Sequence, residues 1–168
     1  KTMTLLVLSS ILLIGCGKKD ANDQLADNPF MQEWNTPFNV PPFDKIDTSD
    51  YIPAFEEGMR QQNAEIDSII NNSEEPTFEN TILAMENSGQ LLNKVSAVFF
   101  NLAECMNNPA MEAIAEEIYP KLSAHEDNIS LNPKLFERVK TVYDKRNTRK
   151  YTPEEYRLLE ETYKGFVR

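Results

Sequence analysis

Apolar residues recur at helical spacing along most of the chain after residue 50. The first stripe predicts a helix that begins near Thr48, Ser49 and Asp50, which offer capping oxygens, and ends near residues 71–73. Its buried face consists of Ile52, Phe55, Met59, Ile66, Ile69 and Ile70. A second helix is predicted from Thr77 as N-cap to Ser88, and the pattern resumes with Leu91, Leu92, Val95, Val98, Phe99, Leu102 and Met106. Gly89, between the two stretches, is either a kink or a break.

Three later helices are predicted by a capping residue placed directly before a proline, which is tolerated at the first helical position. The pairs are Asn108-Pro109, Asn132-Pro133 and Thr152-Pro153. Pro120 should bend or divide the first of these helices, because its ring removes one backbone hydrogen bond. No alternating strand pattern of useful length is found, so the sequence predicts an all-α fold.

The last predicted helix carries apolar residues up to the final positions of the sequence, with no stop signal after them. They are Tyr156, Leu158, Leu159, Tyr163, Phe166 and Val167. Such a face needs a partner, and we expect it to be open near Phe166 and Val167.

The helices are preceded by a run rich in prolines and aromatic rings, from Asn28 to Gly58. Five of its residues are proline, and the rings before residue 44 are Phe30, Trp34, Phe38 and Phe43. Prolines favour extended backbone, and large rings left in water forgo their burial free energy. We therefore expect an ordered extended arm whose four rings clamp it onto the helices.

Residues 1–15 are predicted to be a lipoprotein signal peptide. The apolar stretch from Leu5 to Ile14 is too short for a lone membrane-spanning helix, and Leu13-Ile14-Gly15-Cys16 resembles a bacterial lipobox. Cys16 would then be lipidated, residues 16–27 would form a flexible tether, and the domain would occupy residues 28–168. The residue directly after the cysteine is Gly17 rather than the aspartate that often retains such lipoproteins at the inner membrane. This favours attachment to the outer membrane, with the protein facing the periplasm. The alternative is an ordinary secretory signal with an incidental cysteine.

Charge and cysteine content narrow the function classes. The formal net charge is −10, which argues against nucleic acid as a partner. The basic group Lys145, Arg146, Arg149 and Lys150 is interpreted as a solvated helix end. Cys105 is the only other cysteine and cannot form an internal disulfide, so we expect it to be a small buried apolar residue.

Candidate catalytic groups are few. His125 is the only histidine, and the segment His125-Glu126-Asp127-Asn128-Ile129 lacks the second histidine of a His-Glu-x-x-His zinc motif. We expect His125 to be a hydrogen-bonded structural residue or a surface residue. Serine and cysteine catalytic triads need a histidine base near the nucleophile, and neither Cys16 nor Cys105 lies in such a setting. Paired acidic residues such as Glu56-Glu57 are typical of solvated helix faces.

Several ordered blocks resemble one known family. They are the arm, Tyr51–Met59, Pro76–Ile82, Val98–Leu102, Pro120–His125 and Leu131–Phe136. In this order they are similar to the N-terminal region of the thimet oligopeptidase family of zinc metallopeptidases, and most similar to its bacterial peptidyl-dipeptidase branch. The resemblance covers roughly residues 28–168.

This resemblance implies the multi-helix N-terminal domain of a neurolysin-like fold, forming one wall of a channel for short peptide substrates. It implies a monomeric enzyme that releases C-terminal dipeptides, with Zn²⁺ held by ligands in downstream sequence and a motif glutamate that takes a proton from the zinc-bound water. No catalytic or metal-binding residue is then expected in this chain, which alone would be inactive. The alternative is a stand-alone helical lipoprotein that binds a protein partner through the face near Phe166 and Val167.

Overall fold

The computed structural model describes residues 25–106 and 108–167. These residues form helices and loops without a strand, which confirms the predicted all-α class. The elements are η1 (Pro29–Met31), η2 (Pro37–Asn39), α2 (Thr48–Ile70), η3 (Phe78–Leu83), α3 (Ala84–Glu86), α4 (Gln90–Cys105), α5 (Pro109–Ser130), α6 (Pro133–Asp144) and α7 (Pro153–Val167). The predicted signal peptide, Cys16 and most of the predicted tether lie outside the described residues.

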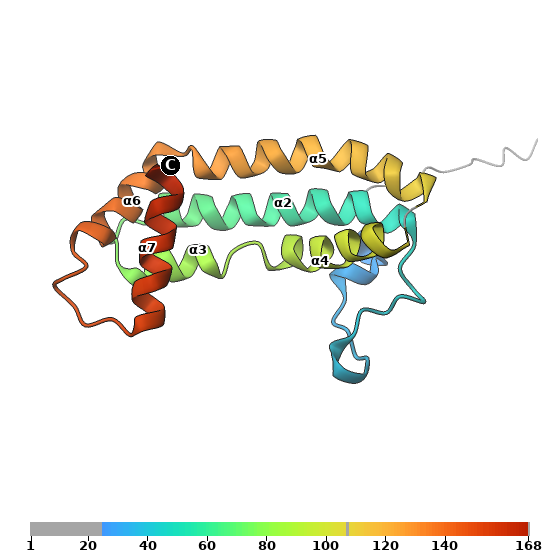
Figure 1. Cartoon of the computed structure of the whole chain (residues 1–168), viewed down its shortest axis with the longest axis horizontal. Coiled ribbons are helices and arrows are strands. Elements are labelled where there is room, and N and C mark those ends of the chain that lie inside the picture. The colour runs from blue at the N-terminus through green and yellow to red at the C-terminus, as the bar shows by residue number, and fades with distance from the viewer. Residues whose placement is uncertain (1–24, 107, 168) are drawn as a thin grey trace, which may run out of the picture.

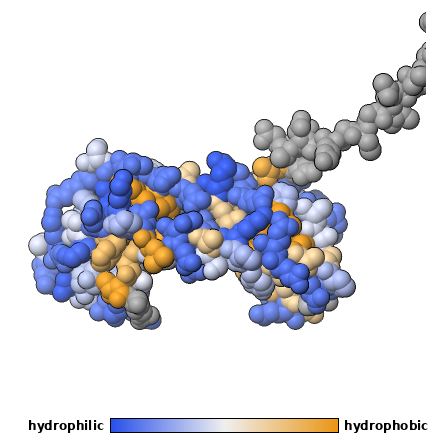
Figure 2. Space-filling model, turned by 90° about the horizontal axis from the view of Figure 1, so that it is seen from above, coloured by the Kyte–Doolittle hydropathy of each residue, from blue (hydrophilic) through white to orange (hydrophobic). Residues whose placement is uncertain are grey.

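Three rows of helix run side by side along the molecule, with α2 between α5 and the α3–α4 row (Figure 1). Helices α6 and α7 lie across one end of these rows. Residues 48–58 of the run that was predicted to be an extended arm belong to α2, so the arm proper is residues 28–47, and it lies at the other end. Seen from above, the molecule has two lobes joined by a narrower waist, with a hollow on one side between them (Figure 2). Because α2 packs against the arm, α4, α5 and α6, it links both lobes.

Helix α2 begins one residue after its N-cap, Asp47, whose backbone N–H donates to the Asp50 carboxylate over 2.8 Å. The prediction that Thr48, Ser49 and Asp50 precede the helix as caps is wrong, because the N-cap is Asp47 and all three lie in the first turn. Asp50 still contributes, as the third helical residue of the capping box. The helix ends at Ile70, next to residues 71–73, where the sequence predicted its end.

Gly89 is a break rather than a kink, because α3 ends at Glu86 and α4 begins at Gln90. Its φ of 71° lies in the left-handed region that favours glycine. A Cβ at this position would lie 2.5 Å from Nε2 of Gln62 on α2, so the break and α2 approach closely. The Gly89 N–H donates to Oε2 of Glu65 over 2.7 Å, which ties the break to α2.

The three proline-led helices begin where predicted. Asn108 and Asn132 each accept two backbone hydrogen bonds at a helix start, and Thr152 and Glu155 exchange the two bonds of a capping box. Helix α5 runs unbroken through Pro120, so the alternative in which this proline divides the helix is wrong.

Each lobe has its own apolar core. The arm-side core joins the arm to α2, α4 and α5 and contains Phe30, Tyr51, Ala54, Phe55, Leu92, Val95, Val98, Phe99, Met111, Ile114 and Ile118. Phe99 stands at its centre, with the rings of Tyr51 and Phe55 at centroid distances of 5.1 and 5.5 Å. These edge-on pairs add to the burial free energy of a core that unites residues far apart in sequence.

The other lobe is built on η3, α6 and α7 around Phe78, Ile82, Val139, Val142 and Leu159. A smaller group, Ile66, Ile69 and Leu135, connects it to α2. Phe166 stacks on Phe136 and packs against both groups, so the predicted open face is wrong for Phe166, whereas Val167 is 52% exposed.

The arm is ordered and packs on the helices, but only two of its four rings hold it there. Phe30 is buried, and Trp34 packs beside it at a centroid distance of 6.2 Å. Phe38 is 99% exposed and Phe43 is 49% exposed, so the expectation that these two rings clamp the arm is wrong. Pro42, between them, is buried in their place.

Candidate functional site

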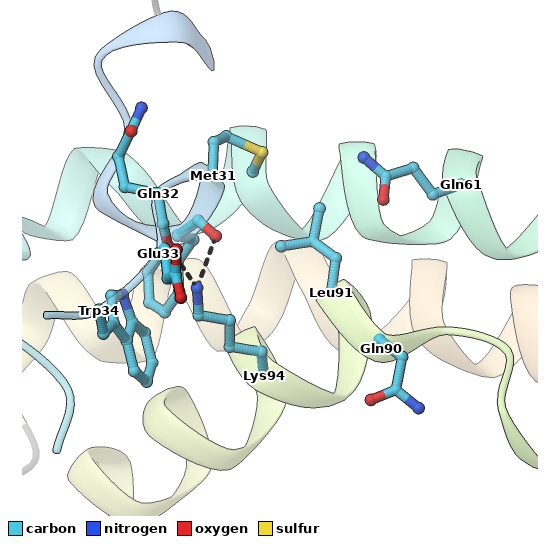
Figure 3. A pocket seen from close by; sticks show the side chains of 9 residues that line it. Met31, Gln32, Glu33, Trp34, Gln61, Gln90, Leu91 and Lys94 are labelled. Carbon is cyan, nitrogen blue, oxygen red and sulfur yellow. Dashed lines mark hydrogen bonds between the residues drawn. The ribbon is translucent and has the colours of Figure 1, made fainter. Parts of the chain in front are cut away.

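A cavity of about 620 Å³ opens where the arm meets α2 and α4 (Figure 3). We call it the arm groove. Its lining combines apolar, aromatic, amide and charged side chains: Phe30, Met31, Gln32, Glu33 and Trp34 from the arm, Gln61 from α2, and Gln90, Leu91 and Lys94 from α4. A mixture of apolar surface with a few polar groups is typical of binding sites.

Lys94 holds the arm against α4 from within this groove. Its Nζ donates to the backbone oxygens of Phe30 and Gln32 over 3.0 and 2.8 Å (Figure 3) and lies 4.1 Å from the ring centroid of Trp34. The Trp34 indole N–H donates to the Pro29 oxygen over 3.0 Å, which fixes the ring. Burial lowers the pKa of Lys94 from its ordinary value, and carbonyl dipoles and the ring face stabilise the ammonium.

Two glutamine side chains line the part of the arm groove away from Trp34 (Figure 3). Gln61 donates from Nε2 to Glu57 over 2.8 Å, and Gln90 donates to the Asn87 oxygen over 3.3 Å. Their carbonyl oxygens add acceptor capacity, which suits ligands rich in amide N–H groups. The lining residues supply binding groups but neither a nucleophile with its base nor a metal-ligand set.

A second cavity, of about 420 Å³, lies where α2, α4 and α5 meet. It is lined by Gln62, Leu92, Asn93, Ser96, Leu122, His125, Glu126, Ile129 and Ser130. His125 is buried there, with Nε2 2.7 Å from Oε1 of Gln62. Gln62 donates from Nε2 to Oγ of Ser88, so its Oε1 accepts and the proton is assigned to Nε2 of His125. Burial lowers the pKa of His125, which favours the neutral ring.

His125 is therefore the hydrogen-bonded structural residue that was one of the two expectations, and the surface alternative is wrong. It joins α5 to α2 and, through Gln62 and Ser88, to the break before α4. Within the described ranges, no group of three or more His, Cys, Asp or Glu side chains could hold a metal ion.

The environment of Cys105 differs from the one that the sequence predicted. Cys105 is exposed, so its prediction as a buried residue is wrong. The physical reason is that the last turn of α4 extends beyond the arm-side core, where Met106 is also 69% exposed.

The basic group after α6 is only in part a solvated helix end. Lys145 pairs with Glu75 in the loop before η3, and Arg149 pairs with Glu79 in η3, so these two side chains contact a neighbouring segment although they remain exposed. Lys150 is exposed. Among the described residues, no helix is both long enough and apolar enough to cross a bilayer.

The arm groove and the Lys94 contacts were missed by reasoning from the sequence. The only signal was a single lysine within the apolar stretch from Leu91 to Leu102, which by itself does not identify a partner more than sixty residues away in the chain.

Comparison with known proteins shows relatives that are peptidases. The chain is 36% identical over 143 residues to the dipeptidyl carboxypeptidase of Salmonella typhimurium, an alignment that covers 85% of this chain and 21% of that enzyme. It is 39% identical over 140 residues to the dipeptidyl carboxypeptidase of Escherichia coli, covering 83% and 21%. Organellar oligopeptidase A of Arabidopsis thaliana is 22% identical over 147 residues, covering 88% and 18%. No family model matches the chain.

The chain is thus a homologue of peptidases. More particularly, the predicted resemblance to the thimet oligopeptidase family is confirmed, and identity is higher to the two bacterial dipeptidyl carboxypeptidases than to the plant oligopeptidase. The chain spans about a fifth of the length of the curated relatives it matches.

Proposed function

We propose that this chain is the N-terminal part of a longer zinc peptidyl-dipeptidase that removes dipeptides from the C-termini of short peptides. The observation that carries the proposal is 36–39% identity to two dipeptidyl carboxypeptidases over more than four fifths of the chain. Identity at this level over so long a stretch supports a shared activity of the longer proteins.

In this proposal the helices contribute one wall of the substrate channel, and the arm groove is part of that wall. Two features support the assignment. The groove offers amide oxygens and an indole ring, which match the backbone N–H groups and side chains of a short peptide. The surface between the two lobes is hollowed (Figure 2), as a wall that borders a channel requires.

The described residues do not fit a zinc site. The Nε2 atom of His125 is hydrogen-bonded to Gln62, and no group of three or more His, Cys, Asp or Glu side chains among these residues could hold a metal ion. We therefore place the zinc ligands, and the general base of the reaction, in the part of the longer protein outside this chain. The 168 residues alone would then have no peptidase activity.

We further propose that Cys16 carries the lipid anchor and that the enzyme is a monomer facing the periplasm from the outer membrane. Residues 28–168 would then form the N-terminal helical domain beyond a short tether. The lipobox-like sequence before Cys16 supports the lipid anchor, and two or more acyl chains give stable membrane attachment.

The test begins with the gene downstream of Arg168. An open reading frame that encodes His-Glu-x-x-His is expected, whereas a stop codon after Arg168 would favour the stand-alone helical lipoprotein instead. The full-length protein should release C-terminal dipeptides from short peptides, lose this activity with a chelator and regain it with Zn²⁺. The control is the variant in which the motif glutamate is replaced by glutamine, which should fold and bind zinc but turn over no peptide.

The anchor is tested separately with Cys16→Ser. This variant should leave the membrane fraction and keep its peptidase activity, because Cys16 lies outside the proposed catalytic part. Retention of Cys16→Ser in the membrane fraction would contradict the lipid anchor and leave the peptidase proposal intact.

A further inference from the structure

The tip of the arm, Thr36–Phe43, presents apolar side chains to water. We call these eight residues the arm tip. Phe38 is 99% exposed, Phe43 49% and Val40 46%, and none of the eight residues carries a charge. Single exposed apolar residues are common on proteins, but three within six positions form a patch.

The backbone of the arm tip is strained at the point where it presents Phe38. Phe38 and Asn39 have φ values of 58° and 55°, in the left-handed region. Asparagine adopts this conformation more readily than most residues, but it is a marked outlier for a bulky residue such as phenylalanine, so the strain lies at Phe38. Strain of this kind persists only where the surrounding contacts impose it.

Local contacts impose it here. The Thr36 hydroxyl donates to the Val40 oxygen, and the Asn39 N–H donates to the Thr36 oxygen over 3.1 Å, which closes the loop. Pro37, Pro41 and Pro42 restrict the remaining backbone freedom, and Pro42 is buried. The arm tip is therefore preorganised, so docking it elsewhere loses little conformational entropy.

We propose that the arm tip inserts Phe38 into an apolar pocket in the part of the longer protein that lies outside this chain. This inference rests on the proposed function, in which the polypeptide continues as it does in its relatives. Burial of the Phe38 ring would offset both its hydration cost and the backbone strain.

The size of the arm tip favours an occupant from the same polypeptide. A stable complex with a free partner buries about 800 Å² on each side, which is more than three side chains provide. A pocket in the same polypeptide needs less area, because its effective concentration is on the order of millimolar even for a flexible connection. The matched relatives are nearly five times longer than the aligned stretch, which leaves ample surface to supply such a pocket.

A membrane surface is a poorer occupant. Attachment to anionic lipids depends on lysines and arginines near the inserted residues. The arm tip has no basic residue, the chain carries a net charge of −10, and the flanking residues Asp44 and Lys45 cancel each other.

The test is photo-crosslinking in the full-length protein, with p-benzoylphenylalanine placed at position 38. The matched control places it at position 131, since Leu131 is also a large apolar residue, 77% exposed, at the junction of α5 and α6. We expect a crosslinked peptide from sequence beyond residue 168 at position 38, with a yield at least about tenfold that at position 131. Crosslinks to lipid, to a second copy or to another protein, or a yield at position 38 no higher than at position 131, would overturn the inference.

A second readout uses Phe38→Ser and Leu131→Ser in the full-length protein. The first variant should lower the thermal midpoint of the full-length protein below that of wild type, because it removes the burial of the ring, and the second should leave the midpoint unchanged. Chelator-sensitive dipeptide release together with a failed crosslink would overturn this inference alone. Absence of dipeptide release would count against the proposed function, and absence of downstream coding sequence would count against both.

Discussion

Gly58 permits the close approach of α2 and α4, and replacing it should separate the two helices. A Cβ built on Gly58 would lie 2.9 Å from Cα and 3.0 Å from N of Leu92. Both are backbone atoms, so no side-chain rotation relieves the contact, and α4 must shift as a unit. The prediction is that Gly58→Ala destabilises the protein although alanine is the better helix former.

The magnitude follows from two opposing terms. Overpacking a well-packed interface costs about 1–3 kcal/mol, and replacing glycine by alanine inside a helix contributes about 0.5–1 kcal/mol of stability. We expect a net loss of about 1–2 kcal/mol in the free energy of unfolding. The matched control is Gly165→Ala on α7, where an added Cβ meets no heavy atom within 4 Å. It should gain about 0.5–1 kcal/mol.

The assay is urea unfolding followed by far-ultraviolet circular dichroism, with wild type and both variants measured side by side. Gly58→Ala should lower the midpoint at an unchanged slope, and Gly165→Ala should raise it. The reasoning is refuted if Gly58→Ala unfolds at or above the wild-type midpoint, because the helix-propensity term would then exceed the cost of the contact.

Three further predictions concern single side chains. Lys94→Met should release the arm and red-shift the emission of Trp34, the only tryptophan, and unchanged emission would contradict a clamping role for Lys94. Burial lowers the pKa of His125 below 6.5, so the unfolded chain binds a proton at a higher pH than the folded protein does. The free energy of unfolding should therefore fall as pH decreases from about 6.5 towards 5. This range lies above the one in which the glutamates with lowered pKa values titrate. His125→Gln should flatten this dependence, and a histidine that titrates at or above pH 6.5 by NMR would show that its ring is not desolvated. Asn132→Ala should cost about 1 kcal/mol by removing the N-cap of α6, measured by thermal unfolding, and Asn132→Asp should restore most of it.

The helices could be predicted from the sequence because their signals are local. Thr77 and the residues before Pro109 and Pro133 fix helix starts through contacts within three positions, so the short-range pattern contains the whole cause. The fold class and most helix boundaries follow from these signals and from the apolar period.

The arm groove and the contacts of His125 could not be predicted in the same way. The oxygens that accept from Lys94 lie 62 and 64 positions away, and Gln62 lies 63 positions from His125. Such pairs depend on how helices cross, which the apolar period does not specify. Phe38 was mispredicted for a related reason: aromatic content indicates that rings seek burial, but the backbone turn at Phe38 aims its ring away from the body.

In the proposed longer protein, helix α2 would have a mechanical consequence for any movement. Its 23 residues span about 34 Å, and its two ends belong to the cores of different lobes. A straight helix resists compression and bending, so a push applied at the α6–α7 end would displace the arm by nearly the same distance. The two lobes should consequently move as one rigid lever, with any flexing confined to the joints between this body and its surroundings.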